Sequence, residues 1–312
     1  MKTSALKFFD DKDFARPPLK WVGGKGQLLP TISDLYPIKL KASGIKRYIE
    51  PFIGGGAVFF DISNKFNVFE NFLFDINPEL VILYNVIKND VDSLISELEI
   101  LQKVYNSLDR ERLFYFLRDK YNQYDKGVDT NKYSRDFIGR AALTVFLNKT
   151  CYNGLYRVNS HGMFNVPMGR YDNPTICDAD NLHAASSALQ NAIIKCADFS
   201  ESLQFAGKDA FIYYDPPYRP ISATASFKSY SKSGFNDADQ ARLSDVFAKA
   251  DFAGAMQMLS NSDPTNHDTN DLFFDNLYSG YNIHRVSARR AVNSDASKRG
   301  EVRELIITNY ES

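Results

Sequence analysis

Residues 210–218, with the sequence AFIYYDPPY, combine a short apolar and aromatic run with an acid and two prolines. The run 210–214 predicts a buried strand, because it is short, rich in aromatic residues and followed by turn residues. Asp215 then lies where the strand gives way to a loop, which is where open α/β sheets hold their ligands. We therefore predict an α/β sheet with a ligand site at the end of this strand.

The four residues Asp215, Pro216, Pro217 and Tyr218 suit a flat base that carries an exocyclic amine. The prolines stiffen the loop, so that the Asp215 carboxylate and the Pro216 carbonyl can accept the two N–H groups while Tyr218 stacks on the ring. These hydrogen bonds push the nitrogen toward a tetrahedral shape and aim its lone pair at an electrophile. The best electrophile for a methyl group is a sulfonium, so the pattern predicts methyl transfer from S-adenosylmethionine, catalysed by positioning and electrostatics. An ordinary turn is the alternative.

Residues 19–26, LKWVGGKG, predict one half of a cofactor site. Glycines allow close approach of the backbone, Trp21 offers an aromatic wall and Lys25 a cation. A phosphate-binding P-loop is excluded, because Lys25 precedes Gly26 and the GxxxxGK spacing is missing. We expect Lys25 to bind a carboxylate, that of the methionine part of the cofactor.

A second glycine-rich turn, EPFIGGGAVFF at 50–60, lies between a predicted strand at 47–51 and a helical pattern, as in nucleotide-binding units. Its Gly54 and Gly56 are predicted to approach the cofactor. A further strand, 68–74, ends at Asp75, 21 residues beyond Gly54, near the ~20-residue spacing of an acid that binds ribose hydroxyls. A dinucleotide remains an alternative, although Phe59 replaces the third glycine of GxGxxG, and so does a tight turn with a surface acid.

An acid and an aromatic residue, Asp198 and Phe199, follow a predicted strand at 192–196. Such a pair can bind and sandwich an adenine ring, although it is also common in turns. Three more strands are predicted at 255–259, 281–287 and 303–308, the last two antiparallel and joined by a basic loop.

Length and composition favour one α/β domain with a sizeable insertion, because 312 residues with 44% hydrophobic side chains can bury a large core. We predict a leader at 1–16, a catalytic cofactor-binding domain at 17–78 and 175–312, a helical and DNA target-recognition insertion at 79–174, and a flap at 222–234. Without a signal-peptide core or an apolar stretch of 18 residues, we expect a cytoplasmic protein away from membranes. The cysteines and histidines show no ligand spacing, so we expect neither disulfide nor metal.

The formal net charge of −1 argues against a protein that coats nucleic acid, but the cations are clustered. Basic stretches at 140–171, 219–232 and 285–303 predict a directed phosphate-binding face, with a solvated charged surface as the alternative. Within 148–171, aromatic residues, amides and arginines alternate with turn residues. This suits a loop and hairpin presented to DNA, where Lys149 is expected to meet phosphate. An ordinary polar hairpin is the alternative.

Taken together, the stretches LKWVGGKG, EPFIGGGAVFFD, FDINPE, FLNKTCYNGLYRVNSHGMFNVPMGRY, CADF and DPPY resemble the Dam family of DNA adenine-N6 methyltransferases, especially its restriction-associated members that recognise GATC. The resemblance runs from Pro17 to the C-terminus. It implies a doubly wound, Rossmann-like S-adenosylmethionine-dependent methyltransferase sheet with an inserted, mainly helical plus hairpin DNA-recognition region. Met168 departs from the pattern, because many relatives have Phe there.

The resemblance also implies roles for individual residues. It implies cofactor contacts by Trp21, Lys25, Asp75 and Asp215, with adenine held near Asp198 and Phe199. The positions that contact or intercalate DNA in the family correspond to Lys20, Tyr152, Asn153, Leu155, Arg157, Pro167 and Arg170.

The expected substrate is double-stranded DNA, with a cognate restriction endonuclease acting on the same site as a further partner. Two other functions stay open. One is an amino-methyltransferase for cytosine N4, RNA or a protein amide, and the other is a catalytically silent DNA-binding protein. The DNA-reading hairpin favours the adenine enzyme over the first alternative, and intact Lys25 and Asp215 argue against the second.

Overall fold

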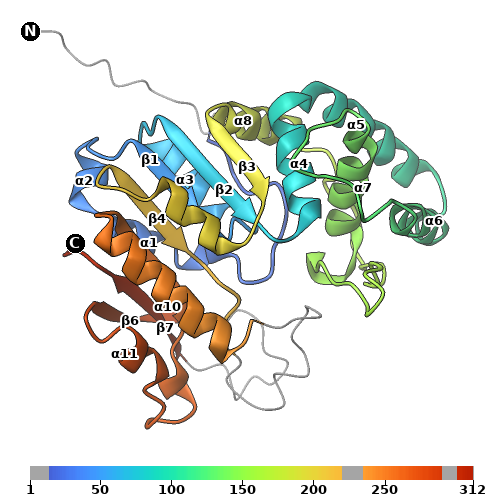
Figure 1. The fold of residues 1–312 in the computed structure, drawn as a ribbon. Coiled ribbons are helices and arrows are strands. Elements are labelled where there is room, and N and C mark those ends of the chain that lie inside the picture. The colour runs from blue at the N-terminus through green and yellow to red at the C-terminus, as the bar shows by residue number, and fades with distance from the viewer. Residues whose placement is uncertain (1–13, 220–234, 290–300, 312) are drawn as a thin grey trace, which may run out of the picture.

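The computed structural model describes residues 14–219, 235–289 and 301–311 (Figure 1). The predicted leader is therefore described only from residue 14 on, where the backbone N–H groups of Ala15 and Arg16 donate to the side chains of Asn64 and Asn181. The predicted flap at 222–234 lies outside the described residues, as does most of the basic stretch 219–232.

A seven-stranded sheet with the order β3-β2-β1-β4-β5-β7-β6 organises the molecule. The strands are β1 (Arg47–Glu50), β2 (Glu70–Asp75), β3 (Ala192–Cys196), β4 (Ala210–Tyr214), β5 (Met256–Ser262), β6 (Asn282–Arg289) and β7 (Glu301–Thr308). Strands β1 to β5 pair in parallel, whereas β7 runs antiparallel between β5 and β6. The strand order reverses between β1 and β4, and open α/β sheets bind ligands at such a switch point.

Helices cover both faces of the sheet (Figure 1). They are α1 (Leu29–Asp34), α2 (Ile38–Lys41), α3 (Ala57–Lys65), α4 (Pro78–Asn89), α5 (Val91–Ser107), α6 (Arg110–Asn122), α7 (Phe137–Thr150), α8 (Ala179–Leu189), α10 (Asp237–Phe252) and α11 (Phe273–Leu277). Short 3₁₀ turns are η2 (Lys25–Gln27), η3 (Tyr152–Gly154), η4 (Phe199–Phe205) and η5 (Pro264–Asn266). Helices α5, α6 and α7 extend away from the sheet beyond α4.

Polar side chains set where several helices begin. Asn77 caps α4 by accepting a hydrogen bond from the Glu79 N–H, and Asp109 caps α6 in the same way. Asn236 and Asp239 form a reciprocal capping box at the start of α10. Each cap satisfies N–H groups that the first turn of a helix leaves without a partner.

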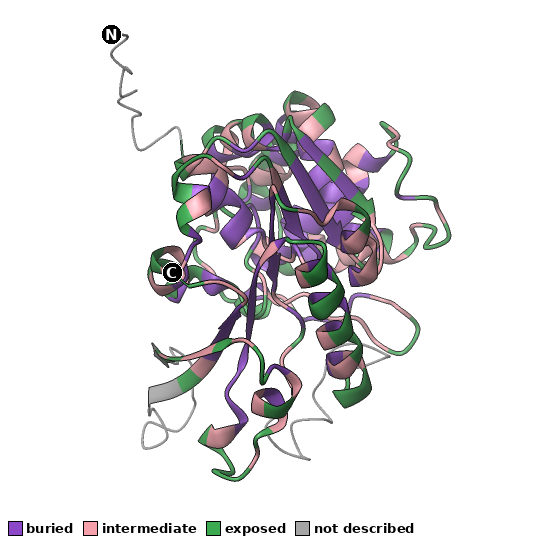
Figure 2. Cartoon of the chain, turned by 60° about the vertical axis from the view of Figure 1, so that its left-hand side comes forward, coloured by how far each residue is buried: buried purple, intermediate pink, exposed green. Residues whose placement is uncertain are grey.

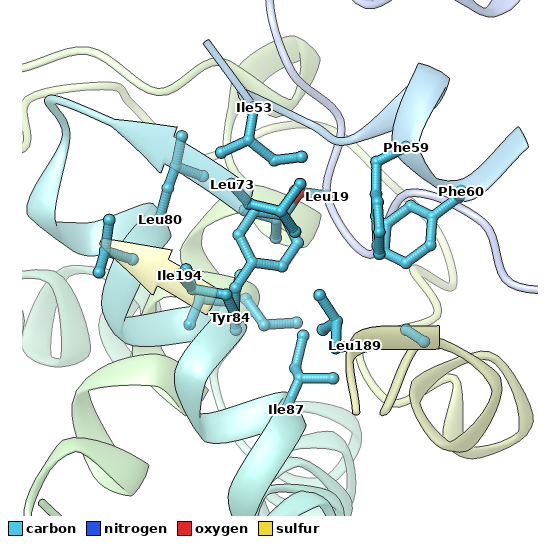
Figure 3. Close-up of a cluster of buried hydrophobic side chains, with 14 of the residues drawn as sticks. Leu19, Ile53, Phe59, Phe60, Leu73, Leu80, Tyr84, Ile87, Leu189 and Ile194 are labelled. Atoms are coloured by element: carbon cyan, nitrogen blue, oxygen red, sulfur yellow. The ribbon is translucent and has the colours of Figure 1, made fainter. Parts of the chain in front are cut away.

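Strand β4 is apolar along its whole length because both faces of the sheet are covered there. Successive side chains of a strand point to opposite faces, so Tyr213 joins a cluster with helix α3, while Tyr214 packs with Phe247 of α10. The central strands β1, β4 and β5 are buried along nearly their whole length, whereas the edge strand β6 is partly exposed (Figure 2). Figure 3 shows the first cluster, where Leu73 of β2 and Tyr84 of α4 meet side chains from α3 and α8. The predicted fold class, a doubly wound Rossmann-like methyltransferase sheet with helices, is confirmed.

Candidate active site

Four neighbouring parallel strands bring acids to one edge of the sheet. The register aligns Asp75 of β2 with Cys196 of β3, two residues before Asp198, and aligns β1 with β4 through Ile49 and Ile212. Asp215 follows the last residue of β4. The acids that were predicted separately from three stretches of sequence therefore lie along the carboxyl ends of adjacent strands, at the switch point of the sheet.

Lys25 and Asp215 form a buried ion pair at this edge of the sheet. Lys25 Nζ lies 2.7 Å from Asp215 Oδ1, and only 5% of the lysine side chain is exposed. Lys25 also donates to the carbonyl of Gly23 at 2.8 Å. Burial raises the pKa of Asp215, whereas the lysine charge lowers it. The N-terminal Gly-Lys stretch thus reaches the DPPY motif directly, and Lys25 contacts a carboxylate of the protein itself.

The remaining residues of the DPPY motif are held from several elements. Tyr218 donates its hydroxyl proton to Glu304 Oε2 at 2.5 Å, and Lys25 Nζ lies 4.5 Å from the centroid of the tyrosine ring. The carbonyl of Pro217 accepts from Gln240 Nε2 of α10. Among the residues that the structure describes, none donates to the Pro216 carbonyl, so this oxygen remains available as an acceptor.

The two glycine-rich stretches meet through Trp21. Gly54 has φ of +46°, and a Cβ there would lie 3.1 Å from Trp21 Cδ1. Gly56 has φ of +75°, and a Cβ there would lie 3.0 Å from Phe60 Cε2. Side chains are strained in this left-handed conformation and would also meet their neighbours, so both positions require glycine. Trp21 in turn stacks on Tyr156, with ring centroids 5.3 Å apart.

Asp75 closes the same turn. Its Oδ2 accepts from the Gly54 N–H at 3.0 Å, and its Oδ1 accepts from the Asn77 N–H at 2.8 Å. Burial raises the pKa of Asp75 to about 6, although these N–H groups oppose the shift. A carboxylate held this way can still accept hydrogen bonds from ligand hydroxyls, because each oxygen has two acceptor positions.

Asp198 and Phe199 follow the end of β3, as predicted, but Arg242 of α10 contacts both side chains. The Arg242 guanidinium donates to the two Asp198 carboxylate oxygens at 2.7 and 2.9 Å and lies 4.0 Å from the centroid of the Phe199 ring. The charge-assisted hydrogen bonds lower the pKa of Asp198 to about 2. Phe199 is buried and stacks on Phe52 at 5.4 Å.

Four further residues of this region were not predicted from the sequence. Arg242 belongs to an ordinary amphipathic helix, and no local pattern marks it. Glu50 ends β1 with 2% of its surface exposed, accepts from Tyr48 Oη at 2.6 Å and has a pKa raised by burial. Glu304 interrupts the apolar pattern of β7, and Ile76, which is 65% exposed, follows Asp75 directly. An acid at the end or in the middle of a core strand is a signal that could have singled out both glutamates.

The predicted DNA-reading segment folds as a loop and an irregular hairpin after α7. Isolated antiparallel bridges join Cys151 to Met168 and Val158 to Phe164, and the Tyr152 N–H donates to the Pro167 carbonyl. Among the residues predicted to contact DNA in this segment, four are exposed, namely Tyr152, Asn153, Pro167 and Arg170. Two more, Leu155 and Arg157, are partly exposed.

The cations of this segment already have neighbours. Arg157 donates from Nε to Asn165 Oδ1 at 2.7 Å, across the hairpin. Lys20 Nζ lies 5.4 Å from the Tyr171 ring centroid, which places the N-terminal stretch beside the hairpin. Lys149 is half-buried, and desolvation lowers its pKa.

The predicted basic face is wrong for several of its members. Arg140 is 2% exposed and donates from Nε and Nη2 to the carboxylate of Glu79 at 2.8 and 2.7 Å, so it cannot meet phosphate. Arg219 is bound by Asp237 and Asp271, and Arg285 by Asp275. These acids were not expected as partners from the sequence, because each lies at least ten residues away from its arginine.

No group of three metal-ligating side chains is found within residues 14–219, 235–289 and 301–311. Among the helices in those ranges, none is both long enough and apolar enough to cross a membrane.

Several known proteins are similar to this chain. The family model of the D12 class N6 adenine-specific DNA methyltransferases matches residues 21–292. The type II methyltransferase M.MjaIII of Methanocaldococcus jannaschii is 46% identical over 299 residues, which cover 95% of this chain and 99% of that protein. The type II methyltransferase M1.LlaDCHI of Lactococcus lactis subsp. cremoris is 39% identical, with 95% of both chains covered. The DNA adenine methylase of Haemophilus influenzae is 34% identical, covering 93% of this chain and 92% of its own. The chain therefore belongs to the D12 class of N6 adenine-specific DNA methyltransferases.

Proposed function

We propose that this methyltransferase takes its methyl group from S-adenosylmethionine and transfers it to adenine N6 within GATC of double-stranded DNA, after the adenine has left the stack. The observation that carries the proposal is the DPPY motif at the switch point of the sheet, with Asp215 paired to Lys25 at 2.7 Å. Family membership already implies an adenine in DNA as the substrate and a methyl donor as the second reactant.

The chemistry of the site suits S-adenosylmethionine. The turn around Gly54 and Gly56 leaves no space for side chains, and Asp75 beside it can accept hydrogen bonds from ribose hydroxyls. Ile76, which is 65% exposed beside Asp75, offers apolar surface for an adenine ring. When bound, this cofactor supplies an electrophilic methyl group on a sulfonium. The residues proposed to bind it are Trp21, Lys25, Gly54, Gly56, Asp75, Asp198, Phe199 and Asp215.

The DPPY residues would act on the target adenine. Asp215 and the Pro216 carbonyl accept one hydrogen bond each from the N6 amino group. Pro217 keeps the loop stiff, and the Tyr218 ring stacks on the extruded base. The Lys25 ammonium favours the ionised, hydrogen-bond-accepting form of Asp215, against the effect of burial.

Recognition of DNA is proposed to lie in residues 79–174, and cofactor binding in 17–78 with 175–312. The exposure of Tyr152 and of the hairpin beside it supports this division. The residues proposed to contact DNA are Lys20, Lys149, Tyr152, Asn153, Leu155, Arg157, Pro167 and Arg170. The GATC assignment rests on the resemblance of 148–171 to the corresponding segment of GATC-reading enzymes. The names of two relatives, type II methyltransferases, support a cognate restriction endonuclease acting on the same site.

The test is to express the chain in a methylation-free host and to sequence the methylated bases of the DNA. We expect N6-methyladenine in GATC, and none in a host that expresses Asp215→Ala. Methylation of adenine in another sequence would reject the GATC assignment, and N4-methylcytosine would reject the choice of base. Binding of the Asp215→Ala protein to GATC duplexes should remain measurable, which separates loss of chemistry from loss of folding.

A further inference from the structure

The hydroxyl of Tyr218 has a specific partner outside the DPPY motif. It donates to Glu304 Oε2 at 2.5 Å, across 86 residues of sequence. Short O–H···O⁻ hydrogen bonds to a carboxylate are roughly twice as strong as neutral ones. Stacking on a base needs only the ring of Tyr218, so this hydroxyl contact is not explained by the stacking role alone.

Glu304 stands on a rigid support. It lies within β7, where it pairs with Ser262 of β5 on one side and with Val286 of β6 on the other. The next residue on the same face of the strand, Ile306, is buried in the cluster that also contains Tyr213. A strand that is hydrogen-bonded on both sides holds its backbone in place, so the Glu304 side chain starts from a rigid anchor and its carboxylate can serve as a support for Tyr218.

Tyr218, by contrast, lies in a loop. The DPPY residues follow the end of β4 without regular secondary structure. Two contacts define where the ring lies: Lys25 Nζ over the ring, 4.5 Å from its centroid, and Glu304 at the hydroxyl. The hydrogen bond fixes the position of the hydroxyl at the far end of the ring, and because a phenolic O–H prefers the plane of its own ring, it also favours one orientation of the ring plane.

We propose that Glu304 is a positioning residue of the base-binding site, which acts by fixing the Tyr218 ring in the orientation that an extruded base stacks on. This inference rests on the proposed function and deepens it. A ring that is already ordered loses less conformational freedom when the base arrives, so more of the stacking energy remains for binding the transition state. The Tyr218 hydroxyl is then required because its hydrogen bond to Glu304 keeps the ring oriented, although the hydroxyl touches no reacting atom.

The proposal is tested with a double-mutant cycle of Tyr218→Phe and Glu304→Ala, read by single-turnover methylation at saturating DNA and cofactor. Each single substitution is expected to slow methylation by roughly 10- to 100-fold, the range of one hydrogen bond to a charged group. Because both remove the same contact, the double variant should be no more than about threefold slower than the slower single variant. Glu304→Gln keeps an acceptor oxygen and should lie between Glu304→Ala and the parent.

Two further measurements separate positioning from a structural role. The affinity for S-adenosylmethionine and the midpoint of thermal unfolding should stay at parental values in Glu304→Gln and Tyr218→Phe, while the methylation rate falls. Glu311→Gln is the matched control, since this exposed glutamate lies just beyond β7 and should leave the rate unchanged.

Parental methylation in Glu304→Ala, or losses that multiply in the double variant, would overturn the positioning role. The cycle is run on whichever DNA base the parent methylates, so a failure of the adenine or GATC assignment is seen in the parent alone and is distinct from a failure of the cycle.

Discussion

At the scale of single residues, the site contains three carboxylates with different partners. Asp215 pairs with the Lys25 ammonium, Asp75 accepts from the backbone N–H groups of Gly54 and Asn77, and Asp198 is held mainly by the Arg242 guanidinium. Burial raises the pKa of the first two, whereas the guanidinium lowers that of the third. The acids differ in environment, so substitutions at each should have separable effects.

Asp75→Ala should weaken binding of S-adenosylmethionine by roughly 1.5–3 kcal/mol, because it removes a charge-assisted contact to the ribose. Calorimetric titration measures the affinity, and circular dichroism checks the fold. Since the pKa of Asp75 is about 6, the affinity of the parent should also decline as the pH falls below that value and the carboxylate is protonated. Unchanged affinity in the alanine variant would show that Asp75 does not bind the ribose.

Lys25→Met should move the acidic limb of the pH–rate profile to higher pH. Burial raises the pKa of Asp215 and Lys25 opposes this shift, so loss of the lysine raises the pKa further. The ionised form of Asp215, which accepts a hydrogen bond from the N6 amino group, then forms only at higher pH. Single-turnover rates at saturating cofactor, measured across the acidic range, test the sign, and a limb that stays in place would contradict the role of the ion pair.

At the scale of elements, the hairpin after α7 is built to present side chains at its exposed end. Arg157 is anchored through Nε to Asn165, while within the described ranges its Nη1 makes no hydrogen bond and can face a ligand. An anchored guanidinium loses little freedom when it binds, which suits the reading of O6 and N7 of a guanine. Lys149 lies in the last turn of α7, before the hairpin begins.

Arg157→Ala should relax the reading of one base pair by ~1–3 kcal/mol, whereas Lys149→Ala should weaken binding to all sequences alike. The measurement is methylation of a duplex library in which each position of GATC is varied in turn. Equal loss on every duplex in the Arg157 variant would reduce that residue to a phosphate contact.

At the scale of the whole molecule, a buried ion pair joins α7, which extends away from the sheet, to α4, which packs on it. Glu79 lies at the start of α4, which packs on β2 and β3, and Arg140 lies in α7. Burial alone would disfavour both charges, but the arginine lowers the pKa of Glu79 by bidentate hydrogen bonding. This pair joins elements that are 61 residues apart in the sequence.

Arg140→Ala should lower the free energy of unfolding by about 3 kcal/mol, the low end of the range for a broken buried ion pair, because it removes the main partner of the Glu79 carboxylate while Lys126, 3.0 Å from Glu79 Oε1, remains. Denaturant unfolding measures this change. The salt dependence of DNA binding by the folded variant should match that of the parent, since Arg140 contacts no phosphate. Arg170→Ala, at an exposed position of the hairpin, is the control with the opposite pattern: parental stability and a shallower salt slope.

Much of the sheet was predictable from the sequence. The apolar run 210–214 coincides with β4 and the predicted strand 192–196 with β3, while the antiparallel pair at the C-terminus appears as β6 and β7. Period-two patterns and short buried runs depend only on neighbours along the chain and on which faces are covered. The glycine-rich turn at 54–56 was predictable for the same reason, because a turn between a strand and a helix depends on nearby residues, whereas the positive φ of Gly54 and Gly56 is known from the structure.

The partners of the site residues were decided only by the tertiary structure. Lys25 meets Asp215, Tyr218 meets Glu304, Asp198 meets Arg242, and Arg140 meets Glu79. Strand order, register and the packing of the helices bring these pairs together, and the sequence separation between partners leaves no periodic trace. Residue types therefore indicated which chemistry the chain carries, whereas the orientation and charge of each group depend on contacts that exist only once the sheet has formed.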